Sequence, residues 1–177
     1  MRRFKAAERA EAGMGAKVIQ SPPPIRMQDM PSSVRDASRL LKVSSSDVHG
    51  RGVYAKEFIP AGTRIIEYTG RRMAWEEAED DENDPHTFIF GLEDGKVINA
   101  AIDGNEARWI NHSCDPNCEA IEKKGRVFIH AMRDIERGEE LSYDYALEID
   151  EPITEKAKKQ YECFCDSPNC RGTLLGL

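Results

Sequence analysis

Four cysteines in two separate parts of the chain have the spacing of a metal site. Cys163, Cys165 and Cys170 lie close together near the end of the sequence. Structural zinc is held tetrahedrally by four ligands, so three thiols leave one position to be filled from elsewhere. Cys114 is the best-placed fourth ligand, because it ends a segment of polar and small residues and not an apolar strand. We therefore expect a zinc ion that joins the C-terminal tail to the segment ending at Cys114.

The fifth cysteine, Cys118, is left over in this assignment. An odd count of five cysteines fits poorly with a closed disulfide framework. Zinc plus one spare thiol accounts for all five. We interpret Cys118 as a small buried hydrophobic residue.

A glycine-containing loop, His49–Ala55, formally satisfies the dinucleotide-binding pattern G-x-G-x-x-G/A. The context contradicts that function, because Ser44–Asp47 precede the loop in place of an apolar strand. Pro60 and Gly62 then arrive too soon for a helix to follow. The glycines fit better with a backbone that a ligand approaches closely, or with a tight turn between two strands.

The segment Asn111–Cys114 allows two further interpretations. Asn111-His112-Ser113 is a formal glycosylation sequon, which matters only in a secreted protein, and residues 1–17 lack the apolar core of a secretory signal. His112 and Cys114 could lie on one face of an extended stretch, where the imidazole could activate the thiol as a nucleophile. The sequence shows no further group that would complete such a site.

The composition, and the alternation of short β-rich runs with turn residues, predict one mainly β domain with additional flanking segments. The chain has 177 residues, 40% of them hydrophobic, and no run approaches the ~18 apolar residues of a membrane span. Turn residues such as Pro60-Ala61-Gly62 separate many short β-rich runs, which argues against βαβ winding. The expected strands are Leu40–Val43, Gly52–Ala55, Thr63–Tyr68, Thr87–Phe90, Val97–Ala100 and Arg126–His130.

The remaining segments interrupt or flank these strands. Residues 1–38, broken by glycines and by Ser21-Pro22-Pro23-Pro24, predict a flexible N-terminal arm. Met73–Asp84 predicts a helix within an acidic insert, residues 73–85, which Pro85 ends; we interpret it as a solvated helix and loop. Ile153–Tyr161 predicts a second helix, which leads into the cysteine-rich tail.

Together these segments resemble the SET-domain protein lysine methyltransferases over roughly residues 40–177. Arg108–Cys118 and Glu139–Tyr145 resemble the two signature segments of the family, Cys163–Gly172 its post-SET zinc segment, and His49–Ala55 its cofactor loop. The resemblance implies a SET-domain β-fold of short curved sheets with a knot-like C-terminal arrangement, few short helices and a zinc-binding tail. It divides the chain into an arm, residues 1–38, a SET domain, residues 39–147, and a connecting helix with post-SET segment, residues 148–177.

The resemblance also implies the site. Tyr145 takes the catalytic position, and Tyr143 the position that tunes how many methyl groups fit. Phe88 and Phe90 line the substrate channel, and the zinc ligands are the four cysteines named above. S-adenosylmethionine is the implied cofactor, and the residues expected to bind it are His49, Gly50, Arg51, Gly52, Arg108, Asn111, His112 and Phe164.

The implied reaction explains the choice of phenols. Methyl transfer from a sulfonium to an amine is an in-line displacement, which needs positioning more than acid–base catalysis. Free lysine has a pKa of ~10.4, so desolvation must help the amine to arrive neutral. A phenol orients the amine without ionising, and residues i and i+2 of a strand, here Tyr143 and Tyr145, share one face. Phe88 stands where the family commonly has tyrosine, which leaves the product's methylation state open.

A zinc-stabilised binding module that has lost turnover is the main alternative function. Retention of both Tyr145 and the Asn111-His112 pair argues against it. The net charge of -7 argues against direct nucleic-acid binding and suits a basic protein substrate, such as a histone or a DNA-associated protein. We expect an intracellular protein, cytoplasmic if bacterial, because the compact chain resembles free-standing bacterial SET proteins; delivery to a host nucleus, or a nuclear protein, are the alternatives.

Overall fold

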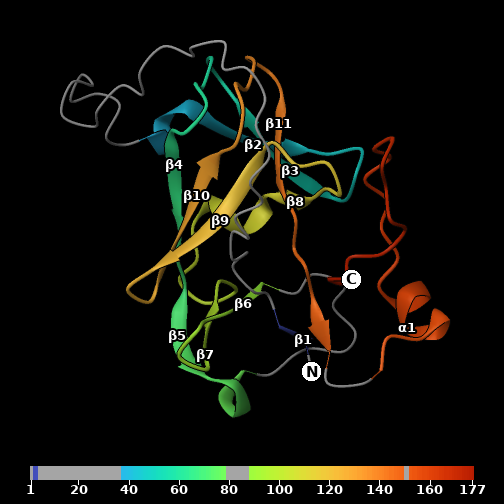
Figure 1. Cartoon of the computed structure of the whole chain (residues 1–177). Coiled ribbons are helices and arrows are strands. Elements are labelled where there is room, and N and C mark those ends of the chain that lie inside the picture. The colour runs from blue at the N-terminus through green and yellow to red at the C-terminus, as the bar shows by residue number, and fades with distance from the viewer. Residues whose placement is uncertain (1, 4–36, 79–87, 150–151) are drawn as a thin grey trace, which may run out of the picture.

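In the part of the chain that the structure describes, the strands form three β-sheets (Figure 1). The computed structural model describes residues 2–3, 37–78, 88–149 and 152–177. The largest sheet has the order β2-β3-β11-β9-β10-β4, and β8 pairs with β11 beside this path. Its strands are β2 (Leu41–Ser45), β3 (Arg51–Ala55), β4 (Arg64–Tyr68), β8 (Asn111–His112), β9 (Cys118–Lys123), β10 (Arg126–Ala131) and β11 (Glu140–Tyr143).

Two smaller sheets and four short helical segments complete the described part. The three-stranded sheet has the order β5-β7-β6, and the two-stranded sheet pairs β1 with β12. The strands are β5 (Arg71–Ala74), β6 (Ile89–Gly91), β7 (Lys96–Asn99), β1 (Arg2–Arg3) and β12 (Glu148–Ile149). The helical segments are the 3-10 turns η2 (Ala37–Leu40), η3 (Trp75–Glu77) and η4 (Glu106–Trp109), and the α-helix α1 (Glu155–Gln160).

The β9–β10 hairpin shows how local sequence fixes register. Lys124 and Gly125 both adopt positive φ, 55° and 70°, which is the conformation that a two-residue primed turn requires. Lys123 therefore pairs directly with Arg126. Alternation along β10 then buries Val127 and Ile129, which form the core with inward residues of the neighbouring strands.

Strand β11 is inserted between strands that come much earlier in the chain. It pairs antiparallel with β3, and parallel with β8 and β9. The parallel register sets Ser142 against Asn111 and Tyr143 against His112. Two distant signature segments of the sequence therefore meet side by side, and this interleaving is the knot-like arrangement expected from the sequence.

The mainly β architecture is confirmed, as are the six expected strands to within two residues at each end. Helix α1 lies within the predicted 153–161, and the Thr154 side chain caps it by accepting the Ala157 N–H at 3.2 Å. None of the helices in the described residues is long and apolar enough to cross a membrane.

The helix predicted at Met73–Asp84 is wrong over its first part. Met73 and Ala74 belong to β5, which pairs with β7, and only Trp75–Glu77 forms a short 3-10 turn. Pairing with β7 and burial of Trp75 outweigh the helix propensity of this stretch. Residues 79–85 lie outside the described part. The arm predicted at 1–38 is also not uniform, since Arg2–Arg3 forms β1 and Ala37 begins η2.

Two isoleucines on adjacent strands test this core. Ile129 is fully buried in β10, whereas Ile121 in β9 is 38% exposed. We expect Ile129→Ala to lower the free energy of unfolding by about 2–5 kcal/mol through the cavity that it leaves. Ile121→Ala, the matched control, should cost no more than about 1 kcal/mol. Urea unfolding measures both, and equal losses would contradict this assignment of the core face.

Candidate active site and metal centre

Two buried tyrosines, Tyr68 and Tyr143, and the partly buried Tyr145 gather where β11 ends. The rings of Tyr143 and Tyr145 lie 4.9 Å apart between centroids. Tyr68 donates its hydroxyl to the Phe88 carbonyl at 3.0 Å. Burial raises the pKa of all three phenols above the ordinary value of about 10, so each is neutral at physiological pH. The phenols can orient a polar group here but cannot act as bases.

Tyr145 is positioned by the segment that follows β11. The strand ends at Tyr143, so the expectation that both phenols belong to one strand is wrong. The Tyr145 backbone N–H donates to His112 Nδ1 at 3.0 Å, and the Tyr145 hydroxyl donates to the Ile110 carbonyl at 2.7 Å. These two bonds, and not strand alternation, bring the ring against Tyr143.

Asp144 ties this segment to the C-terminal tail. Both of its carboxylate oxygens accept from Arg171, at 2.6 and 2.7 Å, and one also accepts the Ala146 N–H at 2.9 Å. Burial raises the pKa of Asp144, but the bonds from Arg171 and Ala146 outweigh it and the net pKa is lowered. Leu147 continues the attachment, donating to Leu174 and accepting from Gly176, both at 3.0 Å.

His112 links the tyrosines to the cysteines. Its side chain is only 3% exposed, and burial lowers its pKa to about 4, so the ring is neutral at pH 7. Since Nδ1 accepts the Tyr145 N–H, the ring proton sits on Nε2. Nε2 lies 3.3 Å from Cys114 Sγ and therefore donates to that sulfur. The His112 side chain thus faces Tyr145 and the sulfurs, and its predicted cofactor role would fall to its backbone.

The four cysteines predicted as ligands come together as one cluster. The sulfurs of Cys114, Cys163, Cys165 and Cys170 all lie within 4.8 Å of one another. Cys114 Sγ is 3.7 Å from Cys163 Sγ and 4.0 Å from Cys170 Sγ. Zinc–sulfur bonds of about 2.3 Å in a tetrahedron separate the sulfurs by about 3.8 Å. The donor set and its spacing therefore fit a structural zinc ion.

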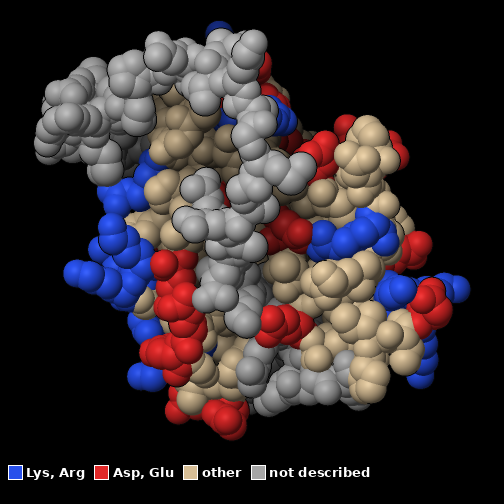
Figure 2. Space-filling view, viewed as in Figure 1, with Lys and Arg blue, Asp and Glu red and all other residues tan. Residues whose placement is uncertain are grey.

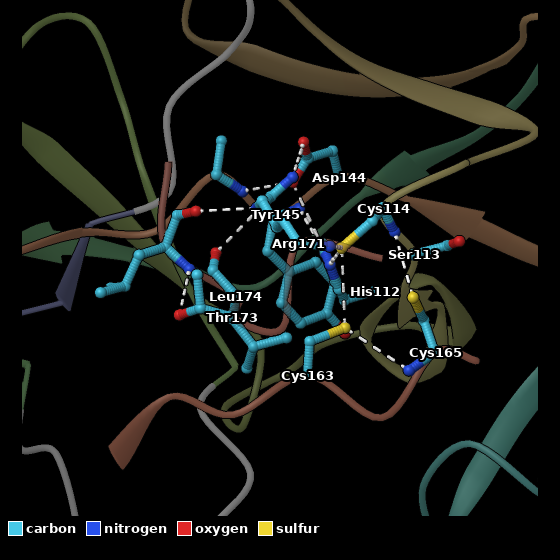
Figure 3. A network of polar contacts seen from close by, with 12 residues as sticks. His112, Ser113, Cys114, Asp144, Tyr145, Cys163, Cys165, Arg171, Thr173 and Leu174 are labelled. Atoms are coloured by element: carbon cyan, nitrogen blue, oxygen red, sulfur yellow. Dashed lines mark hydrogen bonds and ion pairs between the residues drawn. The ribbon is translucent and has the colours of Figure 1, made fainter. Parts of the chain in front are cut away.

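Each sulfur of the cluster also accepts a backbone N–H; Figure 3 shows Cys114, Cys163 and Cys165 with their contacts. Arg171 donates to Cys114 at 3.5 Å; Cys114 donates to Cys165 at 3.4 Å. Cys163 accepts from Cys165, and Cys170 accepts from Gly172, both at 3.4 Å. Donors of this kind stabilise negative sulfur, as expected around metal-bound thiolates.

The surroundings of Cys114 argue against its acting as a nucleophile. Burial raises the pKa of the Cys114 thiol, whereas a reactive cysteine needs a lowered pKa. His112 is also neutral, so it supplies no imidazolium to stabilise a free thiolate. Cys118 stands apart from the cluster: it is fully buried in β9, and burial raises its pKa to about 12.

A second polar network lies on the other side of β11, around Glu140. Asn111 Nδ2 donates to Glu140 Oε1 at 2.7 Å, to the Arg51 carbonyl at 2.9 Å and to Ser46 Oγ at 3.1 Å. Ser46 Oγ and Tyr54 OH also donate to Glu140, at 2.8 and 2.9 Å. Glu140 therefore joins β8 to the predicted cofactor loop, a role that the sequence did not reveal.

Gly52 is required by this network. A Cβ at position 52 would lie 2.1 Å from Glu140 Oε1 and 3.0 Å from the Ser46 Cβ. The close approach predicted for a ligand is therefore made by Glu140 itself. Gly50, at φ 49°, occupies the left-handed region in the same hairpin.

Three other predicted site residues lie around the Trp109 ring. Arg51 and Arg108 each place the guanidinium carbon 4.9 Å from the Trp109 ring centroid, and Phe88 packs edge-on against Trp109 at 5.1 Å. Within the described residues, the buried Arg108 Nε has no hydrogen-bond partner, so a polar ligand could satisfy it.

His49 and Phe164 are exposed, and Phe164, at 65%, is held between two cysteines of the cluster. Phe90 is buried against Tyr68, with ring centroids 5.5 Å apart, and so forms part of the core.

Sequence reasoning missed five residues of the two networks. These are Ser46, Tyr54, Glu140, Asp144 and Arg171. Asp144 and Arg171 stand directly beside Tyr145 and Cys170 in the sequence, so opposite charges next to two predicted site residues were the available signal.

The cysteine cluster yields a metal-content prediction. We expect about one zinc ion per chain, and its loss when Cys114→Ser removes one of four thiolates. Cys118→Ser is the matched control and should keep the metal, because Cys118 lies outside the cluster. Elemental mass spectrometry of the purified proteins measures both. Metal lost from Cys118→Ser and kept by Cys114→Ser would overturn the ligand set.

Comparisons with known proteins agree with this geometry. The chain is 35% identical over 153 residues to histone-lysine N-methyltransferase set1 of Dictyostelium discoideum, covering 81% of this chain and 10% of that protein. It is 40% identical over 139 residues to the H3 lysine-4 specific histone-lysine N-methyltransferase of Saccharomyces cerevisiae, covering 73% of this chain and 12% of that one. The chain thus spans only a small part of the length of these relatives.

A solved structure and a family profile show the same relationship. The crystal structure of KRYPTONITE in complex with mCHG DNA and SAH matches with a TM-score of 0.61 and 31% identity, over 76% of this chain and 28% of that one. The SET-domain profile matches residues 50–146, more than half of the chain. The chain belongs to the SET-domain family.

Proposed function

We propose that the chain is an S-adenosylmethionine-dependent protein lysine methyltransferase whose substrate is a histone or another basic protein. The observation that carries the proposal is a pair of neutral phenols, the buried Tyr143 and the partly buried Tyr145, held beside Asn111 and His112 in a SET domain. Support also comes from relatives named histone-lysine N-methyltransferases and from SAH in the similar structure.

S-adenosylmethionine would supply an electrophilic methyl group, and the protein's own residues would present the amine. The Tyr145 hydroxyl proton is committed to the Ile110 carbonyl, so its oxygen lone pairs can accept an N–H of a lysine amine. The amine's own lone pair is then directed away from Tyr145. The buried, aromatic surroundings disfavour an ammonium ion and so favour the neutral, reactive amine.

The predicted cofactor residues would act largely through the Glu140 network. Asn111 Nδ2 is engaged with Glu140, Ser46 and the Arg51 carbonyl, so this side chain fixes the loop Gly50–Gly52. Arg108 Nε, Trp109 and Phe164 are the groups best placed to contact a cofactor directly. We propose that the zinc cluster holds Phe164 in place by fixing the cysteines on both sides of it.

Replacement of Tyr145 tests the catalytic assignment. Tyr145→Phe should lower turnover about 100-fold while leaving the fold and cofactor affinity nearly intact, because the hydroxyl orients the amine. Tyr143→Phe is the matched control: it should keep turnover and shift product toward higher methylation, since it frees space and removes a polar group. Intact-mass measurement of a lysine peptide, beside thermal unfolding, follows both.

Two outcomes would contradict the assignment of Tyr145. Full activity in Tyr145→Phe would show that its hydroxyl has no part in the reaction. An equal collapse of stability in both variants would make the two tyrosines ordinary core residues. Cofactor binding without any methyl transfer in the wild type would favour the alternative of a zinc-stabilised binding module.

Replacement of Gly52 tests the cofactor loop. In Gly52→Ala the new methyl group would push the Glu140 carboxylate away from its three donors. Loss of about 1–3 kcal/mol should weaken S-adenosylmethionine binding about 5- to 150-fold. Gly176→Ala is the control, because its Cβ would meet no atom closer than 3.4 Å. Calorimetric titration measures affinity, and unchanged affinity in Gly52→Ala would refute this role of the loop.

A further inference from the structure

The short strand β1 lies between β12 and β6, and each of these two strands is connected in sequence to a residue of the candidate site (Figure 1). It pairs antiparallel with β12, with Arg2 opposite Ile149 and Arg3 opposite Glu148. Its Cα atoms also come within 8 Å of Cα atoms in β6. Within the described residues, β12 pairs with no strand except β1, and β6 pairs with no strand except β7.

Both edges are connected directly to the aromatic residues of the site. Phe88 immediately precedes β6, and Tyr145 stands three positions before β12 in the sequence. An unpaired strand edge is a ready acceptor for an extended segment, whose backbone hydrogen bonds supply affinity. An extended segment at this edge therefore lies next to the tyrosines that would orient a lysine.

Charge complementarity favours a basic occupant. The segment Glu148–Glu151 contains Glu148, Asp150 and Glu151, whereas Arg2–Lys5 contains Arg2, Arg3 and Lys5. The register sets Arg3 directly opposite Glu148, a position at which opposite charges favour a strand pair. On the face of the molecule that both figures show, Figure 2 has exposed acidic side chains near the middle. Figure 1 draws the chain from β11 toward β12 in the same region.

We propose that the segment around Arg2–Arg3 is an intramolecular competitor of the substrate: it occupies the β12 edge until a basic extended segment of the substrate displaces it. The inference rests on the proposed function, since it takes the β12 edge as the place where substrate pairs. A pairing of only two residues on each side is weak, so it can be displaced. Its covalent attachment compensates, because a tethered competitor can reach an effective concentration on the order of millimolar.

Backbone substitution in the 177-residue chain isolates this pairing. In an antiparallel pair, adjacent residues alternate between hydrogen-bonded and non-hydrogen-bonded positions, so one of Arg2 and Arg3 directs its N–H at β12. Replacing both by proline removes that donor whichever it is. Replacing both by alanine removes the same charges and keeps the N–H. The two double variants therefore differ only in their ability to pair.

Hydrogen exchange measures the pairing without any need for activity. By the same alternation, one of Glu148 and Ile149 directs its N–H at β1, and we expect that amide to exchange at least several-fold faster in the double-proline variant than in the double-alanine variant. A synthetic peptide with the sequence of residues 1–10, added to the double-proline variant, should restore protection. Equal exchange in the two variants, with no effect of the peptide, would overturn the proposal.

Kinetics measure the competition. If β1 occupies the edge about 80% of the time, the KM for a basic peptide substrate should be about 5-fold lower in the double-proline than in the double-alanine variant, with kcat unchanged. Equal KM values in two active variants would refute the competition while leaving the proposed function intact. Absence of methylation in the wild type would refute the proposed function, and hydrogen exchange would still decide whether β1 holds the edge.

Discussion

The bidentate ion pair between Asp144 and Arg171 is the interaction on which the candidate site most depends. It joins the residue before Tyr145 to the residue after Cys170, so the tyrosine and the metal cluster share one attachment. His112 makes a second connection, accepting the Tyr145 N–H and donating to Cys114. The pair is only half-buried, so breaking it should cost less than the about 3–5 kcal/mol of a fully buried pair. Its larger effect should be on the position of Tyr145.

Those parts of the molecule that local chemistry dictates could be predicted from the sequence. Strands bounded by glycine and proline turns were found, because alternating burial and turn residues are local signals. The four-cysteine cluster was also found, because metal coordination demands a fixed number of ligands and so calls for a distant partner for the tail. The division into residues 1–38, 39–147 and 148–177 stays a prediction, as does the resemblance to free-standing bacterial proteins.

What could not be predicted depends on pairing between distant segments. Met73 and Ala74 form a strand because β7 lies beside them, whereas their sequence neighbours favour a helix. Glu140 joins Ser46, Tyr54 and Asn111 only after β11 has inserted beside β3 and β8. The orientation of His112 toward sulfur, and not toward a cofactor, follows from the hydrogen bond at its other nitrogen. None of these arrangements leaves a local pattern in the sequence.

The central claim is that the C-terminal tail positions Tyr145 through Arg171. Single-turnover methyl transfer in an Arg171→Gln variant tests it most directly, with zinc content and cofactor affinity measured on the same sample. Arg126→Gln is the control, since its ion pair with Glu67 is on the surface of the β4–β10 pair. We expect Arg171→Gln to keep its zinc and its cofactor affinity and to transfer the methyl group about 10- to 100-fold more slowly, while the control is unchanged. A wild-type transfer rate in a zinc-loaded Arg171→Gln protein would contradict the account.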